Sequence, residues 1–223
     1  LIASNDIFLN SSGTLDGVGD QSIISLLGAL TSTSLSKTTA GDLNLGGEVS
    51  ISLNQSLIQS SGVQNFNGPM LLTADVDLNA ESVNFFDALD GPHNLTISTT
   101  GNTVFHENVG SSITLGTGVG PTIIIQAMGS TSFEKNVATI SGIQQIDTAG
   151  PVTFKGDVVI QGTSADSFFN ADVILDGSSF TSSGNVTFGN SSTDSLSLSG
   201  AASIINTSSG NGDIIINSTI DGP

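Results

Sequence analysis

The 223-residue sequence predicts an all-β solenoid, a right-handed parallel β-helix with coils of about 20 residues. Short runs of apolar and β-branched residues alternate with Gly, Asn, Asp and Pro, which is the pattern of short strands joined by turns. No segment has the sustained period of an amphipathic helix, apart from a weak pattern at 21–30. An internal repeat close to the coil length then favours stacked coils over other all-β folds.

The repeat consists of a large apolar residue followed four positions later by a second apolar residue. Its copies are Phe66 with Met70, Phe85 with Leu89, Phe105 with Val109, Phe133 with Val137, Phe154 with Val158, Phe169 with Val173, and Ile216 with Ile220. From Phe66 to Phe169 the first members lie 19, 20, 28, 21 and 15 positions apart. Because equivalent residues of a solenoid stack at the coil period, we expect these fourteen residues to form its repeating core.

A β-sandwich is the competing all-β fold, and it would need hairpins at regular short spacing. The coil-length repeat favours the β-helix, whose narrow interior suits a chain with few large side chains. At a strand spacing of about 4.8 Å, coils of about 20 residues give about 11 coils and a rod of roughly 50 Å. An open end of such a rod exposes a sheet edge, so we also expect end-to-end self-association.

We expect residues 1–223 to be a single β-helix segment of a longer repeat protein. The stretch 1–40 is less regular and is predicted to form a capping or inserted region. The chain begins at Leu1 without a charged and apolar leader, so we expect that any secretion signal has been removed or lies outside this sequence. No apolar run approaches the roughly 18 residues of a membrane-spanning helix, and membrane insertion of this segment is not expected.

Charge limits the partners of the chain. Its formal net charge is −17, it contains no Arg, and its Lys residues are Lys37, Lys135 and Lys155. Binding to nucleic acid or to anionic lipid needs clustered basic residues, so neither is expected as a partner. The acidity is explained by the solubility of an extracellular protein, with calcium binding as the alternative.

The sequence offers no convincing catalytic centre. Polysaccharide cleavage on a β-helix needs paired carboxylates, or Ca²⁺ with a strong base, and sugar rings are usually held by Trp or Tyr. The chain has no Arg, Trp or Tyr. Its densest ionisable group, which we expect to lie on surface loops, contains Asp87, Asp90, His93, His106 and Glu107. We therefore predict a protein that is not an enzyme, with no catalytic residues and no organic cofactor.

Calcium is the one candidate cofactor. The segments at 16–20 and 210–214 have the glycine and aspartate rhythm of calcium-binding nonapeptide repeats, with Asp16, Asp20 and Asp213 as weak candidate ligands. Neither segment repeats in tandem, as that motif requires. We expect these residues to serve in turns.

Several segments resemble the repeats of filamentous-haemagglutinin-like, β-strand-repeat surface adhesins of bacteria. They are Ser61-Gly62-Val63-Gln64-Asn65-Phe66-Asn67-Gly68-Pro69, Leu89-Asp90-Gly91-Pro92-His93-Asn94-Leu95-Thr96-Ile97 and Gly101-Asn102-Thr103-Val104-Phe105, and the resemblance spans roughly residues 41–223. It implies a right-handed β-helix passenger that is secreted across the outer membrane to the bacterial cell surface. It also implies a role in cell adhesion, aggregation or a biofilm matrix.

Three functions follow as hypotheses. The first is an extracellular stalk or adhesive passenger of a large secreted bacterial surface protein, which binds an unidentified receptor or glycan on a host or neighbouring cell. The second is the subunit of a self-assembling extracellular filament or matrix. The third is a carbohydrate-active β-helix enzyme, which would need converging carboxylates in a cleft.

Overall fold

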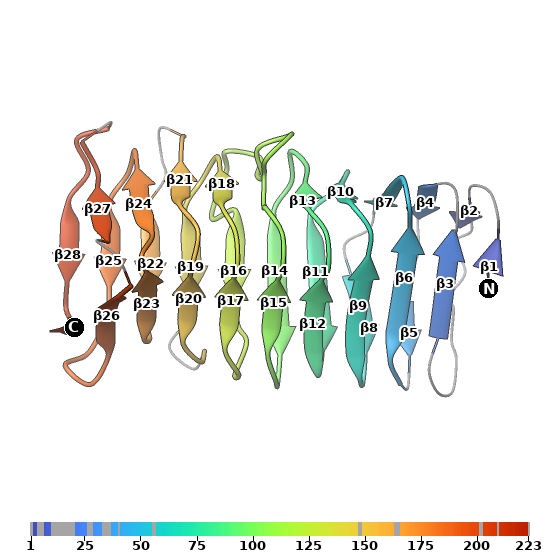
Figure 1. Ribbon diagram of the computed structural model, residues 1–223, viewed down its shortest axis with the longest axis horizontal. Coiled ribbons are helices and arrows are strands. Elements are labelled where there is room, and N and C mark those ends of the chain that lie inside the picture. Colours follow the sequence, from blue (N-terminus) through green and yellow to red (C-terminus); the bar gives the residue numbers. More distant parts are fainter. Residues whose placement is uncertain are drawn as a thin grey trace.

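The computed structural model is a right-handed parallel β-helix (Figure 1). It describes the strands at 2–3, 7–9, 21–25, 29–32 and 37–39 and the stretches 41–54, 57–146, 149–162, 166–200, 203–208 and 210–222. Every strand pair in these residues is parallel, and each coil passes in turn through three faces, here named A, B and C. The described part contains no helix, and therefore none that could cross a membrane.

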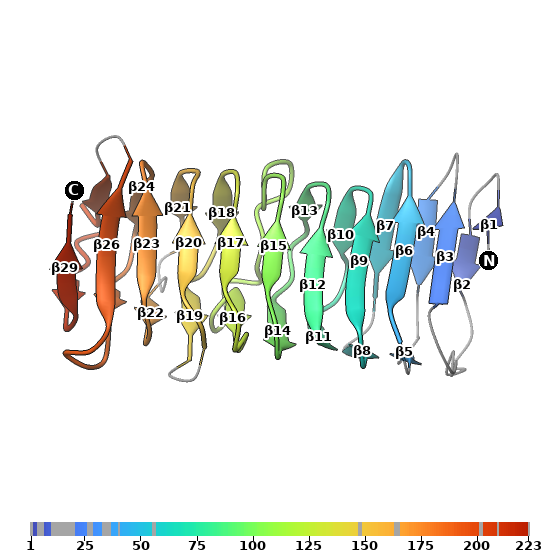
Figure 2. The ribbon, with the colours of Figure 1, turned by 60° about the horizontal axis from the view of Figure 1, so that its bottom comes forward.

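Face A is one continuous sheet of 11 strands, which Figure 2 shows as a single row. Its strands, in spatial order, are β1 (Ile2–Ala3), β3 (Gln21–Ser25), β6 (Leu43–Gly47), β9 (Val63–Asn67), β12 (Ser82–Phe85), β15 (Thr103–Phe105), β17 (Thr131–Phe133), β20 (Val152–Phe154), β23 (Val173–Asp176), β26 (Ser195–Ser199) and β29 (Thr219–Asp221). With the exception of one coil, the number of residues along the chain between paired positions on neighbouring strands of this face is smallest from Val63 to Ser82 and largest from Ser195 to Thr219. Both separations are close to the predicted coil of about 20 residues. The predicted coil length is thus confirmed.

Face B consists of two sheets that continue one another. The first contains β2 (Ile7–Leu9), β4 (Ala29–Ser32), β7 (Ser50–Leu53), β10 (Met70–Leu72) and β13 (Leu89–Asp90); the second contains β18 (Val137–Thr139), β21 (Val158–Ile160), β24 (Ser179–Ser182) and β27 (Ile204–Asn206). Val109 joins the two sheets, because it forms isolated parallel bridges to both Leu89 and Val137.

Face C is a sheet of nine strands that closes each coil. They are β5 (Lys37–Thr39), β8 (Leu57–Ser60), β11 (Val76–Ala80), β14 (Leu95–Thr99), β16 (Ile123–Ile125), β19 (Ile143–Gln145), β22 (Ser167–Phe169), β25 (Val186–Phe188) and β28 (Ile214–Ile216). Alternate residues of these strands point inward, as in Val76–Ala80, where Val76, Leu78 and Ala80 are buried and the two residues between them are exposed.

The stretch 1–40 supplies strands to all three faces. The weak helical pattern at 21–30 is wrong, since β3 and β4 lie there and pair in register with β6 and β7. Tertiary pairing has overridden a short periodic signal. The assignment of 1–40 as a capping or inserted region stays a prediction.

The interior is organised around a column of phenylalanine rings. Phe66, Phe85, Phe105, Phe133 and Phe154 occupy one inward position on successive strands of face A. Their ring centroids are 4.4 to 5.2 Å apart and neighbouring planes lie within 14° of parallel. Parallel stacking and near-complete burial make this column a continuous apolar contact between five successive coils.

The five repeat pairs from Phe66 with Met70 to Phe154 with Val158 each span the corner between face A and face B. Their second members lie at one inward position of face B, where Met70 pairs with Leu89 and Val137 with Val158, and Val109 bridges the gap. All ten residues are buried.

The last two repeat pairs belong to a different corner of the coil. Phe169 lies on face C and pairs with Phe188, whereas Val173 lies on face A and pairs with Val152. Ile216 and Ile220 likewise lie on faces C and A, and they are exposed rather than buried. The two columns continue instead through Leu175 and Phe180. A four-residue spacing occurs at both corners, so the spacing alone does not identify the face.

Turn residues bind the coils to one another. An Asn or Asp oxygen accepts a hydrogen bond from a backbone N–H of the following coil, as between Asn136 Oδ1 and Asp157 N (2.9 Å). The same contact recurs from Asp42 to Val63, Asp75 to Asn94, Asn108 to Asn136, Asp157 to Ser179, Asp166 to Asn185, Asp172 to Ser195 and Asn185 to Asp213. The side chains of several acidic residues therefore accept hydrogen bonds from backbone N–H groups at coil corners.

Candidate functional site

One coil departs from the regular path at the corner between faces B and C. On face A, Thr103 pairs with Thr131, and this step is longer than that between any other two paired strands of the face. The preceding coil passes from Leu89 on face B to Leu95 on face C, whereas this coil needs the whole stretch from Val109 to Ile123 for the same passage. The additional residues form two excursions, an arch at 110–114 and a loop at 116–121, separated by Leu115.

Leu115 returns the chain to face B after the arch. It is fully buried, it bridges to Thr139, and its N–H donates to the Ala138 carbonyl (3.2 Å). The arch is also tied to the preceding coil. Asp90 Oδ1 accepts hydrogen bonds from the backbone N–H groups of Ser112 (3.0 Å) and Ile113 (3.3 Å). The arch is thus anchored to the coils on both sides.

Gly110 begins the arch in a conformation that favours glycine. Its φ is +70°, and a Cβ at this position would lie 2.0 Å from the Ala138 carbonyl oxygen. A larger residue would have both a strained backbone and a steric clash. The path of the arch therefore depends on this glycine.

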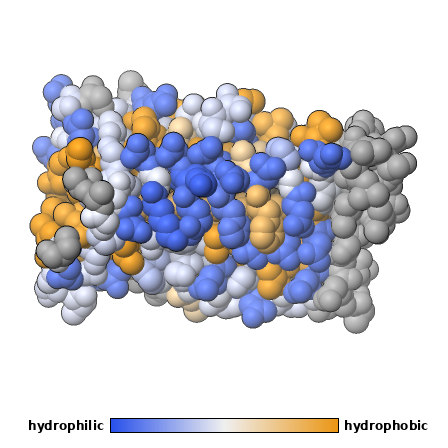
Figure 3. All heavy atoms as spheres, viewed as in Figure 1, coloured by the Kyte–Doolittle hydropathy of each residue, from blue (hydrophilic) through white to orange (hydrophobic). Residues whose placement is uncertain are grey.

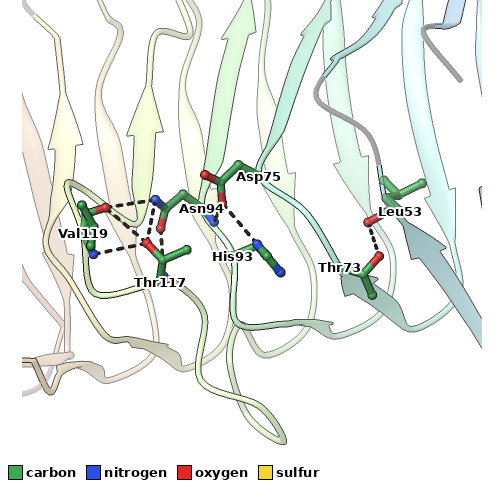
Figure 4. A network of polar contacts seen from close by, with 7 residues as sticks. All are labelled: Leu53, Thr73, Asp75, His93, Asn94, Thr117 and Val119. Carbon is green, nitrogen blue, oxygen red and sulfur yellow. Dashed lines mark hydrogen bonds and ion pairs between the residues drawn. The ribbon is translucent and has the colours of Figure 1, made fainter. Parts of the chain in front are cut away.

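Asn94 organises the loop at 116–121 (Figure 4). Its Nδ2 donates to Thr117 Oγ1 (3.2 Å) and to the Val119 carbonyl (3.1 Å), and its Oδ1 accepts from Thr117 N (3.1 Å). Asp75 in turn accepts a hydrogen bond from Asn94 N (2.9 Å) and lies 3.4 Å from His93 Nδ1. The network holds the loop while Val119 at its tip remains 77% exposed.

A groove of about 480 Å³ lies on face B beside the arch. Ala138 and Val159, the outward residues of the paired strands β18 and β21, form its floor. Asn108, Asn136 and Asp157 line the side at which the chain enters face B, and Gln161 lines the side at which it leaves. Gly110, Ser111 and Thr114 of the arch close one end. The groove combines an apolar floor with amide, hydroxyl and carboxylate groups at its edges.

A second row of side chains lies just after the strands of face A. The rings of Phe86 and His106 stack with centroids 5.0 Å apart and planes 6° from parallel. Further along, Lys155 Nζ lies 2.7 Å from Glu134 Oε2. Hydrogen bonds from Lys155 and Ser132 hold the pKa of Glu134 below its usual range, and the bond from Lys155 has the larger effect. Because the stacked rings face one another, they offer mainly their edges to solvent.

The ionisable group singled out from the sequence does not form one cluster. His93 lies beside Asp75 at the corner between faces B and C, whereas His106 stacks on Phe86 after a strand of face A. Asp90 anchors the arch, and Asp87 accepts a hydrogen bond from Ala88 N. These residues have separate structural contacts.

Two of the candidate calcium ligands, Asp16 and Asp20, lie outside the described residues. Asp213 immediately precedes β28 and is exposed, and its N–H donates to Asn185 Oδ1 (2.7 Å). No group of three or more His, Cys, Asp or Glu residues that could hold a metal ion occurs in the described stretches. Calcium binding stays a prediction.

The groove was not predicted from the sequence. Two signals point to the arch and loop, the long step from Phe105 to Phe133 and the close succession of Gly110, Gly116, Gly118 and Gly120. Neither signal shows where the inserted residues run. Their position is evident only from the pairing of Leu115 with face B.

Fold and surface together define the chain as a parallel β-helix solenoid with a groove on one side. It matches no protein-family model, no curated protein and no solved structure. The chain is thus classified by its fold, as a β-solenoid protein.

Proposed function

We propose that this chain is an extracellular structural and adhesive segment, a stalk or passenger of a large secreted bacterial surface protein. The observation that carries the proposal is the unbroken row of 11 parallel strands on face A. Each coil bonds to its two neighbours, so a solenoid gains length by adding coils and keeps its cross-section. Such a body holds a binding surface at a fixed distance from its point of attachment.

The surface supports a binding role over a catalytic one. The chain has no Arg, and Lys155 is paired with Glu134. Of the described residues that line the groove on face B, one carries a carboxylate, Asp157, whereas glycoside hydrolysis uses two. The groove is thus better suited to holding a ligand than to cleaving one.

A self-assembling filament or matrix subunit is the second candidate. The last coil carries Ile214, Ile216 and Ile220 at inward positions, yet they are 42%, 37% and 56% exposed. The residues that pair with them on the preceding coil, Val186, Phe188 and Leu196, are buried. Figure 3 shows apolar residues gathered at this end of the protein. Apolar side chains at inward positions are covered by a further stacked coil, and in a filament a second copy of this chain would supply that coil.

Bead adhesion tests the leading proposal. Fluorescent beads coated with the purified chain are applied to bacterial and epithelial cell layers, and retention under flow is counted against beads coated with the heat-denatured chain. We expect the folded chain to retain several times more beads on at least one cell type. Equal retention of both bead types on every cell type would contradict an adhesive role.

A further inference from the structure

We propose that the groove on face B binds an uncharged saccharide. This inference rests on the adhesive function proposed above and assigns the ligand class of that adhesion. The lining residues come from three successive coils and from the arch, the one excursion that interrupts face B at this point. A volume of about 480 Å³ lies within the range of small-molecule sites, roughly 300 to 1,000 Å³.

The floor of the groove offers an aliphatic surface to the C–H face of a sugar ring, in place of the Trp or Tyr ring that usually holds a sugar. Val159 points outward from β21 and is 38% exposed, and Ala138 lies beside it on β18. Together they form a small flat apolar surface within an otherwise polar region. Burial of this surface under a sugar ring removes apolar area from water on both partners.

The edge of the groove carries fixed donors. Asn108 Oδ1 and Asn136 Oδ1 each accept a backbone N–H of the next coil, at 3.2 and 2.9 Å. These contacts fix the orientation of both amides, and each Nδ2 is left without a hydrogen bond to the described part of the chain. Ser111 and Thr114 add hydroxyl groups that can donate and accept. Because the amides are already oriented, the protein loses little side-chain entropy when a ligand binds.

Charge selects against acidic sugars. Among the described residues that line the groove, Asp157 is the only charged one, and the chain carries a formal charge of −17. Asp157 Oδ1 accepts the N–H of Ser179 (2.9 Å), so the carboxylate is held in place and its second oxygen can accept from a hydroxyl. A uronate or a sialic acid would be repelled, whereas a neutral sugar offers the hydroxyl donors that this carboxylate needs.

The sheet at the groove also disfavours an extended peptide as the ligand. β18 is bridged to Val109 on one side and paired with β21 on the other, and β21 is paired with β24. No free strand edge is therefore present here for a peptide backbone to join. Ligand contacts must come from side chains, which suits a molecule with many hydroxyl groups.

A glycan array and two variants test the inference. Labelled chain is applied to immobilised neutral oligosaccharides and to uronate- and sialate-containing ones, and hits are titrated by NMR. We expect binding to neutral members and at least tenfold weaker binding of acidic analogues. Val159→Arg should weaken binding at least tenfold by filling the groove. Thr153→Arg, on the same coil but on face A, should bind as the unmodified chain does.

Thermal unfolding shows whether both variants fold. If Val159→Arg does not fold, the combined change of Ser111 and Thr114 to Ala serves in its place. Absence of binding to every neutral oligosaccharide, or equal affinity of the groove variant and the unmodified chain, would overturn the inference. Beads that adhere to cells and are not displaced by the neutral oligosaccharides would refute the groove as the adhesive site while leaving adhesion itself intact.

Discussion

Individual Asp and Asn side chains stabilise the helix as acceptors at its corners. Asp172 Oδ1 accepts both the backbone N–H (2.8 Å) and the hydroxyl (3.0 Å) of Ser195 on the next coil. This use of a carboxylate needs an oxygen at one position and does not need the negative charge. Uncharged Asn residues such as Asn136 therefore take the same role at other corners.

Asp172→Ala should lower the free energy of unfolding by about 1–2 kcal/mol, because two donors lose their acceptor. Asp172→Asn keeps Oδ1 and should cost well under ~1 kcal/mol, since an amide oxygen can accept the same bonds. Urea denaturation of both variants and the unmodified chain measures the difference. An equal loss in the two variants would show that the charge, and not the acceptor, is what stabilises this corner.

The Glu134–Lys155 pair gives a dependence of stability on pH. The pKa of Glu134 is lowered in the folded chain from an ordinary value of 4.5, first by the hydrogen bond from Lys155. The contribution of ionised Glu134 to the stability of the folded chain is therefore fully present above about pH 4.5, and it is lost as the pH falls through the lowered pKa. Both side chains are partly exposed, so solvent screening limits the contribution to below ~1 kcal/mol.

NMR titration of the Glu134 carboxyl group measures this directly. In Lys155→Gln the titration midpoint should move up toward 4.5, since the main cause of the shift has been removed. The same midpoint in both proteins would contradict the assignment of Lys155 as that cause.

Among the structural elements, the arch depends most on a single residue type, the glycine at position 110. Gly110→Ala combines a φ of +70° with a Cβ placed 2.0 Å from the Ala138 carbonyl oxygen. We expect a loss of about 1–3 kcal/mol in the free energy of unfolding and weaker binding in the groove, because the arch forms one wall. Gly120→Ala is the control, with the same φ of +70° but no atom within 4 Å of the added Cβ.

Strand repeats could be predicted from the sequence because stacking places similar residues at a nearly constant spacing. The column from Phe66 to Phe154 is correctly assigned for this reason. Phe169 and Val173 are buried core residues as predicted, but they lie at the corner between faces C and A, which has the same four-residue spacing as the corner between faces A and B. The groove could not be predicted, since it depends on the path of the arch across its neighbours.

At the scale of the whole molecule, the last coil exposes apolar side chains at inward positions that are buried in the preceding coils. Sedimentation velocity at increasing concentration should show larger species, and Ile216→Lys should reduce them by placing a charge in the exposed apolar ring. Phe168→Lys is the matched control, since Phe168 is similarly exposed on face C but points outward from β22. A chain that stays monomeric at every concentration would contradict end-to-end association.

Linear stacking of the coils is the property on which the stalk and the groove both depend. Asn44, Val104, Thr153 and Ser197 occupy the same outward position on four strands of face A. The chain has no Cys, so pairs of introduced cysteines can carry spin labels without background. From Asn44, the three partners lie three, five and seven strands away, which corresponds to backbone distances of ~14, ~24 and ~34 Å at ~4.8 Å per strand.

Electron–electron distance measurements on these three labelled pairs should therefore give values that rise linearly by ~10 Å from each pair to the next, offset by the length of the labels. A distance from Asn44 to Ser197 no longer than that from Asn44 to Val104 would mean that the chain folds back on itself, and the stacked solenoid would be wrong.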